Sequence, residues 1–372
     1  MKNQVMAGVL VALASLSWAQ TTTSASPTSL PTTKLEFATT GGTAVTFPSK
    51  VMYRLPLCSS KGVCYAMFVL NPATGPVPVA NSFDLSGQSH VINPNTIDKM
   101  GSTQVLGLAP VERGVAVLFH GVTSDDNVIG QSKTAKSDTQ PSKVKVRVEG
   151  DFLALYNPEG TLRSVHHLDL RFQPWQIATL GSDQFMLLGF DKLNQRPVIV
   201  SVDTSGEIIR FLDQEGALPS ADEYKSLIEK LVGKNRAMLS SDPAVQNVAT
   251  LSVGISALEF GYTGDRLLLL RPGTDAQLWS ISPGGAIQTV KLKIPHGLKA
   301  DSILSTSDGS WLIRAFVSED TATLLEFDPE SGEVRRQIDS QTVPATSIFY
   351  KKNDTYYAVW WNGDQSLIVK SK

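Results

Sequence analysis

The chain has 372 residues, with 33 Lys and Arg against 35 Asp and Glu, 42% hydrophobic residues and two cysteines. It is too apolar for a disordered chain, too poor in cysteine for a small disulfide scaffold, and too evenly charged for an obvious nucleic-acid binder. A globular protein with one large domain or two smaller ones remains.

The first 19 residues are typical of a cleavable signal peptide. Lys2 precedes the apolar run 5–18, and small residues lead up to Ala19. We expect cleavage after Ala19 and export to the periplasm or the medium. An uncleaved membrane anchor is the alternative, but the run is shorter than the roughly 20 residues that a bilayer requires. Residues 20–33 are rich in Thr, Ser and Pro, so we expect them to be disordered.

Two cysteines six positions apart follow, Cys58 and Cys64. In an exported chain they meet an oxidising compartment, and their spacing suits opposite positions in a hairpin. We therefore predict a disulfide. A zinc site is the weaker interpretation, because two thiolates without neighbouring His or Cys are two ligands short.

From residue 34 onward, short apolar or alternating runs such as 311–317 and 356–361 predict β-strands. One family of turns between them opens with Asp, Asn or Ser and closes with Gly, a residue that can adopt the positive φ such turns need. Its members are Asp84 with Gly87, Asn157 with Gly160, Asp203 with Gly206, Ser282 with Gly285, and Asp328 with Gly332.

The spacing of these turns predicts a repeat. Gly160 and Gly206 are 46 residues apart, and Gly285 and Gly332 are 47 apart. A period of about 45 residues holding four short strands is the length of one β-propeller blade. Six such units fit the chain, and the last lacks a fourth strand, which the unassigned strands 34–37 and 43–47 at the start of the chain can supply. We predict an all-β, six-bladed propeller in a single domain, 34–372; a large β-sandwich is the alternative.

The Asp-x-x-Ser/Thr-Gly turn, as at 203–206, 84–87 and, with one insertion, 328–332, resembles the turns of exported six-bladed propellers of the TolB-like and quinoprotein-like kind. The resemblance covers most of the chain after the signal peptide, and it implies a fold rather than an activity. Kelch, WD and sialidase signatures are absent from the sequence.

Two segments interrupt the period, 121–143 and 213–252. In a four-stranded meander, both connections emerge on the same face of the disc. The second contains a predicted amphipathic helix at about 220–232, in which Ser220 and Glu223 form a capping box. The helix either covers apolar edges of the disc or acts as a lid or partner-binding element.

Residues that enter the inner strands from that face are candidate ligand-binding residues. They are Arg171, Trp175, Gln176, His296, Lys299 and Asp301. A polar and aromatic rim of this kind suits a small polar or sugar-like ligand or a peptide loop. The alternative is that Trp175 packs between blades and the charged side chains are solvated.

The sequence lacks HExxH, GxSxG, Walker and dinucleotide-binding motifs, so we expect no catalytic residue, metal site or cofactor. We favour a non-catalytic, monomeric module that binds a protein or a small polar ligand, without nucleic acid and without a membrane span. A hydrolase or lyase on carbohydrates or lactones, with funnel carboxylates and a central Ca²⁺, is the first alternative. An envelope assembly factor whose helix docks a partner is the second.

Overall fold

The structure is a computed structural model that describes residues 30–50, 52, 55–70, 77–123, 149–181, 184–191, 193–194, 196–212, 226, 258–263, 266–318, 321–363 and 365–372. Within these residues the regular elements are 26 β-strands and two single-turn 3₁₀-helices, η1 (Pro94–Thr96) and η2 (Ala345–Ser347). None of the helices in the described part is long and apolar enough to cross a membrane. The predicted signal peptide and the helix at 220–232, apart from Ser226, lie outside the described residues.

The first half of the described chain forms three separate antiparallel sheets of four strands, each a meander in which consecutive strands are neighbours. The first holds β3 (Leu57–Cys58), β4 (Val63–Leu70), β5 (Val77–Asp84) and β6 (Ser89–Ile92). The second holds β7 (Met100–Val111), β8 (Gly114–Thr123), β9 (Glu149–Tyr156) and β10 (Leu162–Leu168). The third holds β11 (Gln173–Leu180), β12 (Gln184–Asp191), β13 (Arg196–Asp203) and β14 (Ile208–Phe211).

The second half repeats the meander. Strands β15 (Glu259–Thr263), β16 (Arg266–Arg271), β17 (Gln277–Ile281) and β18 (Ile287–Lys291) form one, and β19 (Lys299–Ile303), β21 (Trp311–Phe316), β22 (Ala322–Phe327) and β23 (Val334–Ser340) form the next. The last consists of β24 (Ile348–Lys352), β25 (Thr355–Asn362), β26 (Gln365–Lys370) and, from the start of the chain, β2 (Thr43–Val45). The short strand β20 (Ser305–Thr306) joins β15 to β24, so two of the meanders belong to one nine-stranded sheet.

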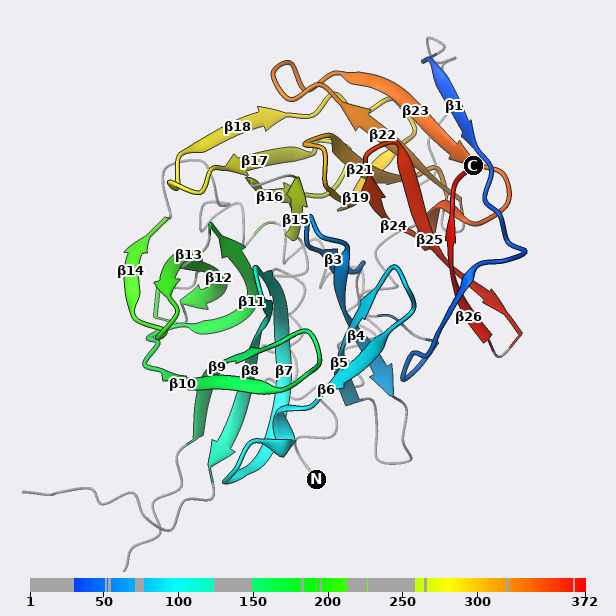
Figure 1. Cartoon of the computed structure of the whole chain (residues 1–372). Coiled ribbons are helices and arrows are strands. Elements are labelled where there is room, and N and C mark those ends of the chain that lie inside the picture. The colour runs from blue at the N-terminus through cyan, green and yellow to red at the C-terminus, as the bar shows by residue number, and fades with distance from the viewer. Residues whose placement is uncertain are drawn as a thin grey trace, which may run out of the picture.

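The meanders follow one another around a common centre, as Figure 1 shows. In this view β15 lies near the centre and β18 at the outside, and β11 and β14 are arranged in the same way. The described chain is therefore all-β and of the propeller type, as the sequence predicts. We call the first strand of each meander its inner strand.

Hydrophobic clusters lie between neighbouring meanders. Each of six clusters combines residues of two adjacent meanders, and together they form a continuous ring. Strand β16 explains how: Leu267 and Leu269 pack in one cluster, while Leu268 and Leu270 pack in the next. Successive side chains of a strand point to opposite faces, so a run of leucines serves two interfaces. Burial of each leucine contributes roughly 1.5–3 kcal/mol.

The predicted Gly turns are confirmed at all five positions, where the closing glycine has a φ between 67° and 92°. In the turn at 203–206, the Gly206 N–H donates to the Asp203 carbonyl oxygen at 3.1 Å. The Asp203 Oδ1 accepts hydrogen bonds from the N–H groups of Ser205 and Glu207. The Ser205 hydroxyl also donates to Asp203 Oδ1, and this bond, with the backbone bonds, holds the pKa of the Asp203 carboxyl below its usual range.

The start of the chain differs from the prediction in one respect. Strand β2 pairs antiparallel with β26 and completes the last meander, as expected for 43–47. The other candidate, 34–37, does not: β1 (Thr32–Leu35) pairs parallel with β23 as a fifth strand. It also begins inside the segment expected to be disordered, because the unpaired edge of β23 supplies hydrogen-bonding partners that composition does not reveal.

Two further predictions, the disulfide and the start of the first insertion, can be compared with the structure. The disulfide is confirmed: Cys58 of β3 and Cys64 of β4 are paired in register with Cα atoms 4.0 Å apart. Strand β8 extends to Thr123, so residues 121–123 belong to the strand rather than to the predicted insertion 121–143. The rest of that insertion lies outside the described residues, as does 213–252 apart from Ser226.

Candidate ligand-binding site

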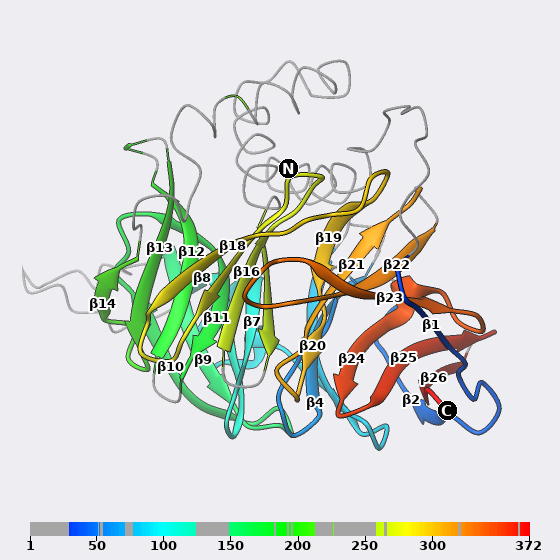
Figure 2. The same ribbon diagram turned by 90° about the horizontal axis from the view of Figure 1, so that it is seen from above.

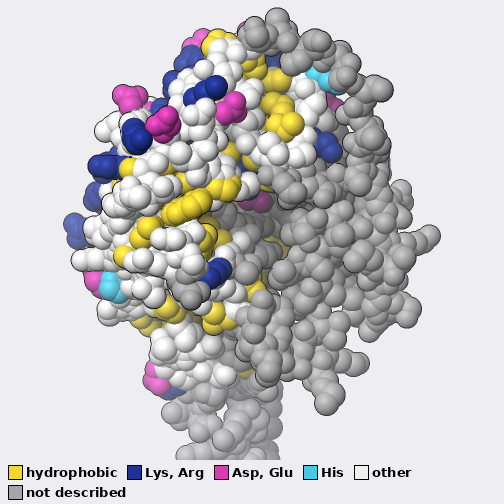
Figure 3. Space-filling view, turned by 90° about the vertical axis from the view of Figure 1, so that its right-hand side faces the viewer, with side chains coloured by type: hydrophobic (Ala, Val, Ile, Leu, Met, Phe, Trp, Pro, Cys, Tyr) yellow, Lys and Arg dark blue, Asp and Glu magenta, His cyan; other side chains and the backbone are white. Residues whose placement is uncertain are grey.

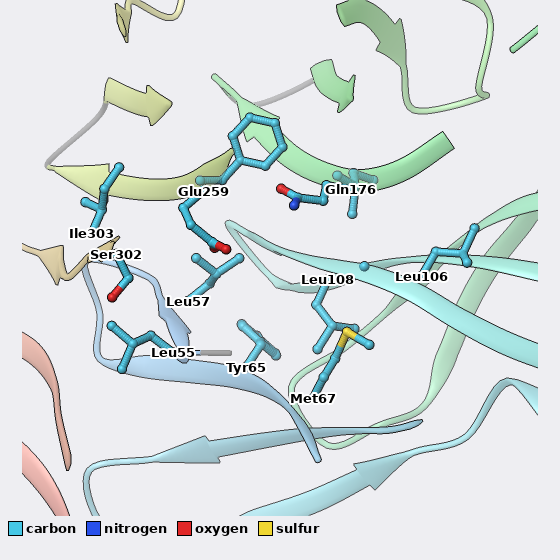
Figure 4. Close-up of a pocket in the computed structure, with 13 residues that line it drawn as sticks. Leu55, Leu57, Tyr65, Met67, Leu106, Leu108, Gln176, Glu259, Ser302 and Ile303 are labelled. Carbon is cyan, nitrogen blue, oxygen red and sulfur yellow. The ribbon is translucent and has the colours of Figure 1, made fainter. Parts of the chain in front are cut away.

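A hollow lies where the inner strands of five meanders meet (Figure 4). Eight of its thirteen lining residues have apolar side chains: Leu55, Leu57, Met67, Leu106, Leu108, Ile177, Phe260 and Ile303. Its cavity volume is about 60 Å³, which is enough for a few waters or one slender chemical group.

Bulges in the inner strands position the lining. The register shifts by one residue at Leu106 in β7, at Trp175 in β11 and at Asp301 in β19. In each case the following residue lines the hollow, namely Gly107, Gln176 and Ser302. A bulge re-aims the side chains of a strand, so the three strands turn equivalent positions inward. Position 107 is tightly confined, because a Cβ there would lie 3.1 Å from the backbone nitrogen of Ile177.

The polar side chains of the hollow are oriented by their neighbours. Gln176 is 4% exposed, and its Nε2 donates to the Leu258 carbonyl oxygen at 3.1 Å, leaving Oε1 as the amide atom without a described partner. The Ser302 hydroxyl donates to Asp301 Oδ2 at 2.9 Å. Glu259, at the start of β15, also lines the hollow, and its carboxylate lies near Leu57 in Figure 4. In Gln176 and Ser302, the described hydrogen bonds therefore use the donor and leave the acceptor oxygen.

Tyr65 lines the hollow from β4 and is 2% exposed. Burial raises the pKa of its hydroxyl well above the usual range, and the charge of Glu159, on the turn between β9 and β10, adds to the effect. Tyr65 is therefore neutral at physiological pH, and Glu259 is the charged side chain among the described residues that line the hollow.

One end of the axis is bridged by β20, which lies low between β4 and β24 in Figure 2. We call this end, where the inner strands finish, the closed end, and the opposite one the starting end. Strand β20 pairs in parallel with both β15 and β24. The Thr263 and Thr306 hydroxyls lie 2.9 Å apart, and the Ser305 Oγ accepts a hydrogen bond from the Cys58 N–H at 3.1 Å.

The same end is linked on the side of β7 and β11. The Thr179 hydroxyl donates to the Pro110 carbonyl oxygen, and the Thr179 N–H donates to the Tyr262 hydroxyl oxygen at 2.6 Å. These contacts connect β7, β11 and β15 near the C-terminal ends of the three strands. Together with β20, they tie the inner strands together at the closed end.

The structure brings only part of the predicted ligand-binding set to the hollow. Gln176 lines it, and Asp301 supports Ser302 while also binding Arg314 of β21 through Nε at 3.0 Å and Nη2 at 2.5 Å. Trp175 instead packs against the cluster between the third and fourth meanders, as its alternative interpretation held. Arg171 and His296 are exposed before β11 and β19, and Lys299 is half-buried at the start of β19. Their role in binding stays a prediction.

Sequence reasoning missed the rest of the lining. Leu57, Leu108, Glu259 and Phe260 are separated by long stretches of chain, and only the closure of the ring brings them together. A signal was available for Phe260 and Glu259, because they open the inner strand that follows the second interruption of the period.

A second titratable group lies on β8 and β9. His120 Nδ1 is 3.0 Å from Asp151 Oδ1, and Nε2 is 3.4 Å from Glu149 Oε1. The hydrogen bond to Asp151 raises the pKa of His120, and partial burial opposes the shift. Within the described part of the chain, no group of three or more His, Cys, Asp and Glu is arranged to hold a metal ion.

The surface in Figure 3 carries basic and acidic side chains close together, with hydrophobic side chains between them, over its described part. Ion pairs such as Lys293 with Glu333 at 2.6 Å and Arg335 with Asp328 at 2.5 Å are exposed. Exposed pairs of this kind contribute little to stability.

No protein-family model and no curated protein matches the sequence. Among solved structures, a protein of unknown function from Bacteroides caccae is 12% identical, covers 83% of this chain and 82% of its own, and has a TM-score of 0.35. The Dos1 propeller is 8% identical, with coverages of 86% and 77% and a TM-score of 0.36. Prolyl oligopeptidase B from Galerina marginata is 11% identical with a TM-score of 0.42; 86% of this chain matches 42% of that one. The chain thus spans less than half of the peptidase it matches.

Proposed function

We propose that the chain is an exported, monomeric six-bladed propeller of the TolB-like or quinoprotein-like kind that binds a small ligand or a protein without catalysis. The six meanders would be its blades, the segments 121–143 and 213–252 would decorate the starting end, and the helix at 220–232 would lie there. The disulfide and the lack of a membrane-spanning helix in the described part are consistent with export.

The axial hollow carries the binding proposal. It is concave, mainly apolar, and contains a few polar groups held in defined orientations, which is the usual character of a binding site. The bridge at the closed end favours approach from the starting end, where the predicted residues Arg171, His296 and Lys299 also lie.

The hydrolase or lyase alternative is less well supported. Glycoside hydrolysis ordinarily uses two carboxyl groups across the scissile bond. Glu259 is one such group among the described lining residues, and Asp301 is engaged by Arg314 rather than directed into the hollow.

The purified chain can be tested by ligand-observed NMR against a library of sugars, amines, lactones and small apolar compounds, with product formation followed in parallel. Saturable binding without turnover is the expected result. Leu57→Trp, which fills the hollow, should abolish it, whereas Val317→Trp, at a position 55% exposed and outside the hollow, should not.

Turnover of a glycoside or lactone that Leu57→Trp abolishes would establish the enzymatic alternative instead. Binding that survives Leu57→Trp would place the site elsewhere. Failure of every compound to bind a folded chain would contradict the small-ligand form of the proposal.

A further inference from the structure

We propose that the axial hollow binds a neutral aliphatic alcohol, with the hydroxyl group donating to Gln176 Oε1 and a short hydrocarbon chain against the leucines of the wall. This inference rests on the binding function proposed above and names the ligand chemistry of that site.

The first argument is the acceptor of Gln176. The residue is 4% exposed, and its Nε2 donates to the Leu258 carbonyl oxygen at 3.1 Å. Because a carbonyl oxygen only accepts, this bond fixes which end of the amide is the oxygen. Oε1 has no hydrogen-bond partner in the described part of the chain, and Figure 4 shows the amide turned from β11 toward the other lining side chains. An acceptor left without a donor at a buried position costs free energy, and a ligand O–H removes that cost.

The second argument is that this acceptor is held in place. The bulge at Trp175 turns Gln176 inward. Strand β7 packs directly against the backbone there, since a Cβ at Gly107 would lie 3.4 Å from the Gln176 Cα. The backbone contact and the bond to Leu258 together limit the conformations open to the side chain. A ligand therefore meets an oriented oxygen and loses less binding free energy to the ordering of this residue.

The third argument is that the hollow offers a ligand no available charge. No Lys, Arg or His is among the described lining residues, and burial keeps the Tyr65 hydroxyl neutral at physiological pH by raising its pKa. Glu259 already takes part in an interaction within the chain, so its charge is not free to pair with a ligand. An ion that enters a mainly apolar space without a partner loses much of its hydration free energy. The hollow therefore favours a neutral ligand over an ammonium or a carboxylate.

The fourth argument is size. A cavity volume of about 60 Å³ suits a slender group rather than a ring system or a sugar, and most of the wall is apolar. A hydroxyl group supplies a donor with a single heavy atom, so the rest of the space is left for hydrocarbon. A carboxamide supplies its donor with a second polar atom that also needs a partner. An alcohol with a chain of about four carbons thus matches both the acceptor and the apolar wall.

The test compares 1-butanol with its isomer methyl propyl ether, which lacks the O–H donor. Binding is measured by ligand-observed NMR on the purified wild-type chain at pH 7. We expect 1-butanol to bind at roughly millimolar concentration, given its few heavy atoms, and roughly tenfold or more tightly than the ether. Butylammonium and butanoate, which are charged, should bind more weakly than 1-butanol. These comparisons need no variant, so they are independent of any folding defect.

A matched pair of variants tests the role of Gln176. Gln176→Met removes the acceptor and keeps a side chain of similar length, so it should reduce the preference for 1-butanol over the ether to roughly onefold. Gln341→Met, the same change at an exposed position after β23, should leave the preference intact. Leu57→Trp, which fills the hollow, should abolish the binding of both compounds.

Equal or tighter binding of the ether, or of either charged compound, overturns the inference but leaves the proposed binding function in place. A preference for the alcohol that persists in Gln176→Met, or binding that persists in Leu57→Trp, overturns it as well. If neither 1-butanol nor the ether binds a folded wild-type chain, the inference is wrong, and the proposed function is then decided by the wider library.

Discussion

The Ser305 hydroxyl oxygen accepts a hydrogen bond from the Cys58 backbone N–H, 247 positions earlier in the chain. Ser305 belongs to β20, which bridges the closed end of the axis, and Cys58 belongs to the disulfide-linked hairpin. The Tyr350 hydroxyl donates to the Ser59 carbonyl oxygen at 3.0 Å and ties the same hairpin to β24. The disulfide therefore stabilises a hairpin on which the closed end depends.

Replacement of both cysteines by alanine should lower the free energy of unfolding by about 2 kcal/mol, because the unfolded chain gains conformational entropy when the short loop between residues 58 and 64 is no longer closed. Urea denaturation with and without a reductant measures it. Reductant should destabilise the wild-type chain and have no effect on the double variant. An identical wild-type midpoint in both conditions would contradict the stabilising role.

Tyr262→Phe should cost about 1–2 kcal/mol, because the Thr179 N–H loses its acceptor at the closed end. Tyr356→Phe is the matched control: its hydroxyl is buried and has no hydrogen-bond partner in the described part of the chain, and burial raises its pKa to about 12. That second change should be neutral or stabilising in thermal or urea unfolding. Equal losses in the two variants would show that the hydrogen bond at the closed end is not what matters.

Lys351→Met should destabilise the chain by about 3 kcal/mol at pH 7, because it removes the partner of a partly buried carboxylate. The Lys351 ammonium contacts Asp308 Oδ2 at 2.5 Å, and the lysine side chain is 5% exposed. Burial acts to raise the pKa of Asp308, but the hydrogen bonds from Lys351 and Ser310 outweigh it and lower the pKa.

The sign of the pH effect follows from that lowered pKa. The ion pair stabilises the folded chain above the pKa that Asp308 has in the unfolded chain, which is near 4. This stabilisation is lost as the pH falls through the lower pKa that Asp308 has in the folded chain. The difference in free energy of unfolding between wild type and Lys351→Met, measured with urea, should therefore become smaller below about pH 4. A gap that stays constant from pH 7 to pH 3 would argue against an ionic contribution.

His120→Gln should change the pH dependence of stability in the opposite direction. Asp151 raises the pKa of His120 in the folded chain. The interaction between protonated His120 and Asp151 therefore stabilises the fold fully below about pH 6.5, and this stabilisation is lost as the pH rises through the pKa of His120 in the folded chain. The wild type should lose stability relative to the variant between about pH 6.5 and pH 8. Urea unfolding at both pH values measures this. A stability difference that does not vary with pH would contradict it, and exposed His296→Gln is the control.

The sequence was sufficient for features that depend on neighbouring residues. The positive φ at Gly206 and Gly332, the hairpin pairing of Cys58 with Cys64, and the use of 43–45 to complete the last meander all follow from local turn chemistry or from the period. The alternation of the buried β16 leucines between two clusters likewise needs only the period of a strand.

The site depended on long-range geometry instead. A bulge shifts the register at Trp175, so this side chain packs between meanders while Gln176 lines the hollow. Nothing in the local sequence distinguishes that arrangement from regular alternation. The bridge by β20 and the parallel pairing of β1 also require strands that are distant in sequence, and edge hydrogen bonding rather than composition decides them.

The pairing of β2 with β26 has a consequence for how the molecule folds. The Ser366 hydroxyl donates to the Val45 carbonyl oxygen across 321 positions. Strand β1, which also lies near the start of the chain, pairs with β23 of the neighbouring meander. During synthesis, β2 leaves the ribosome long before β26 exists for it to pair with. The ring therefore closes only after nearly the whole chain has emerged, and contacts of such long sequence separation form slowly. Until then the first strands expose their edges, which makes the newly synthesised chain most vulnerable to aggregation in the interval before closure.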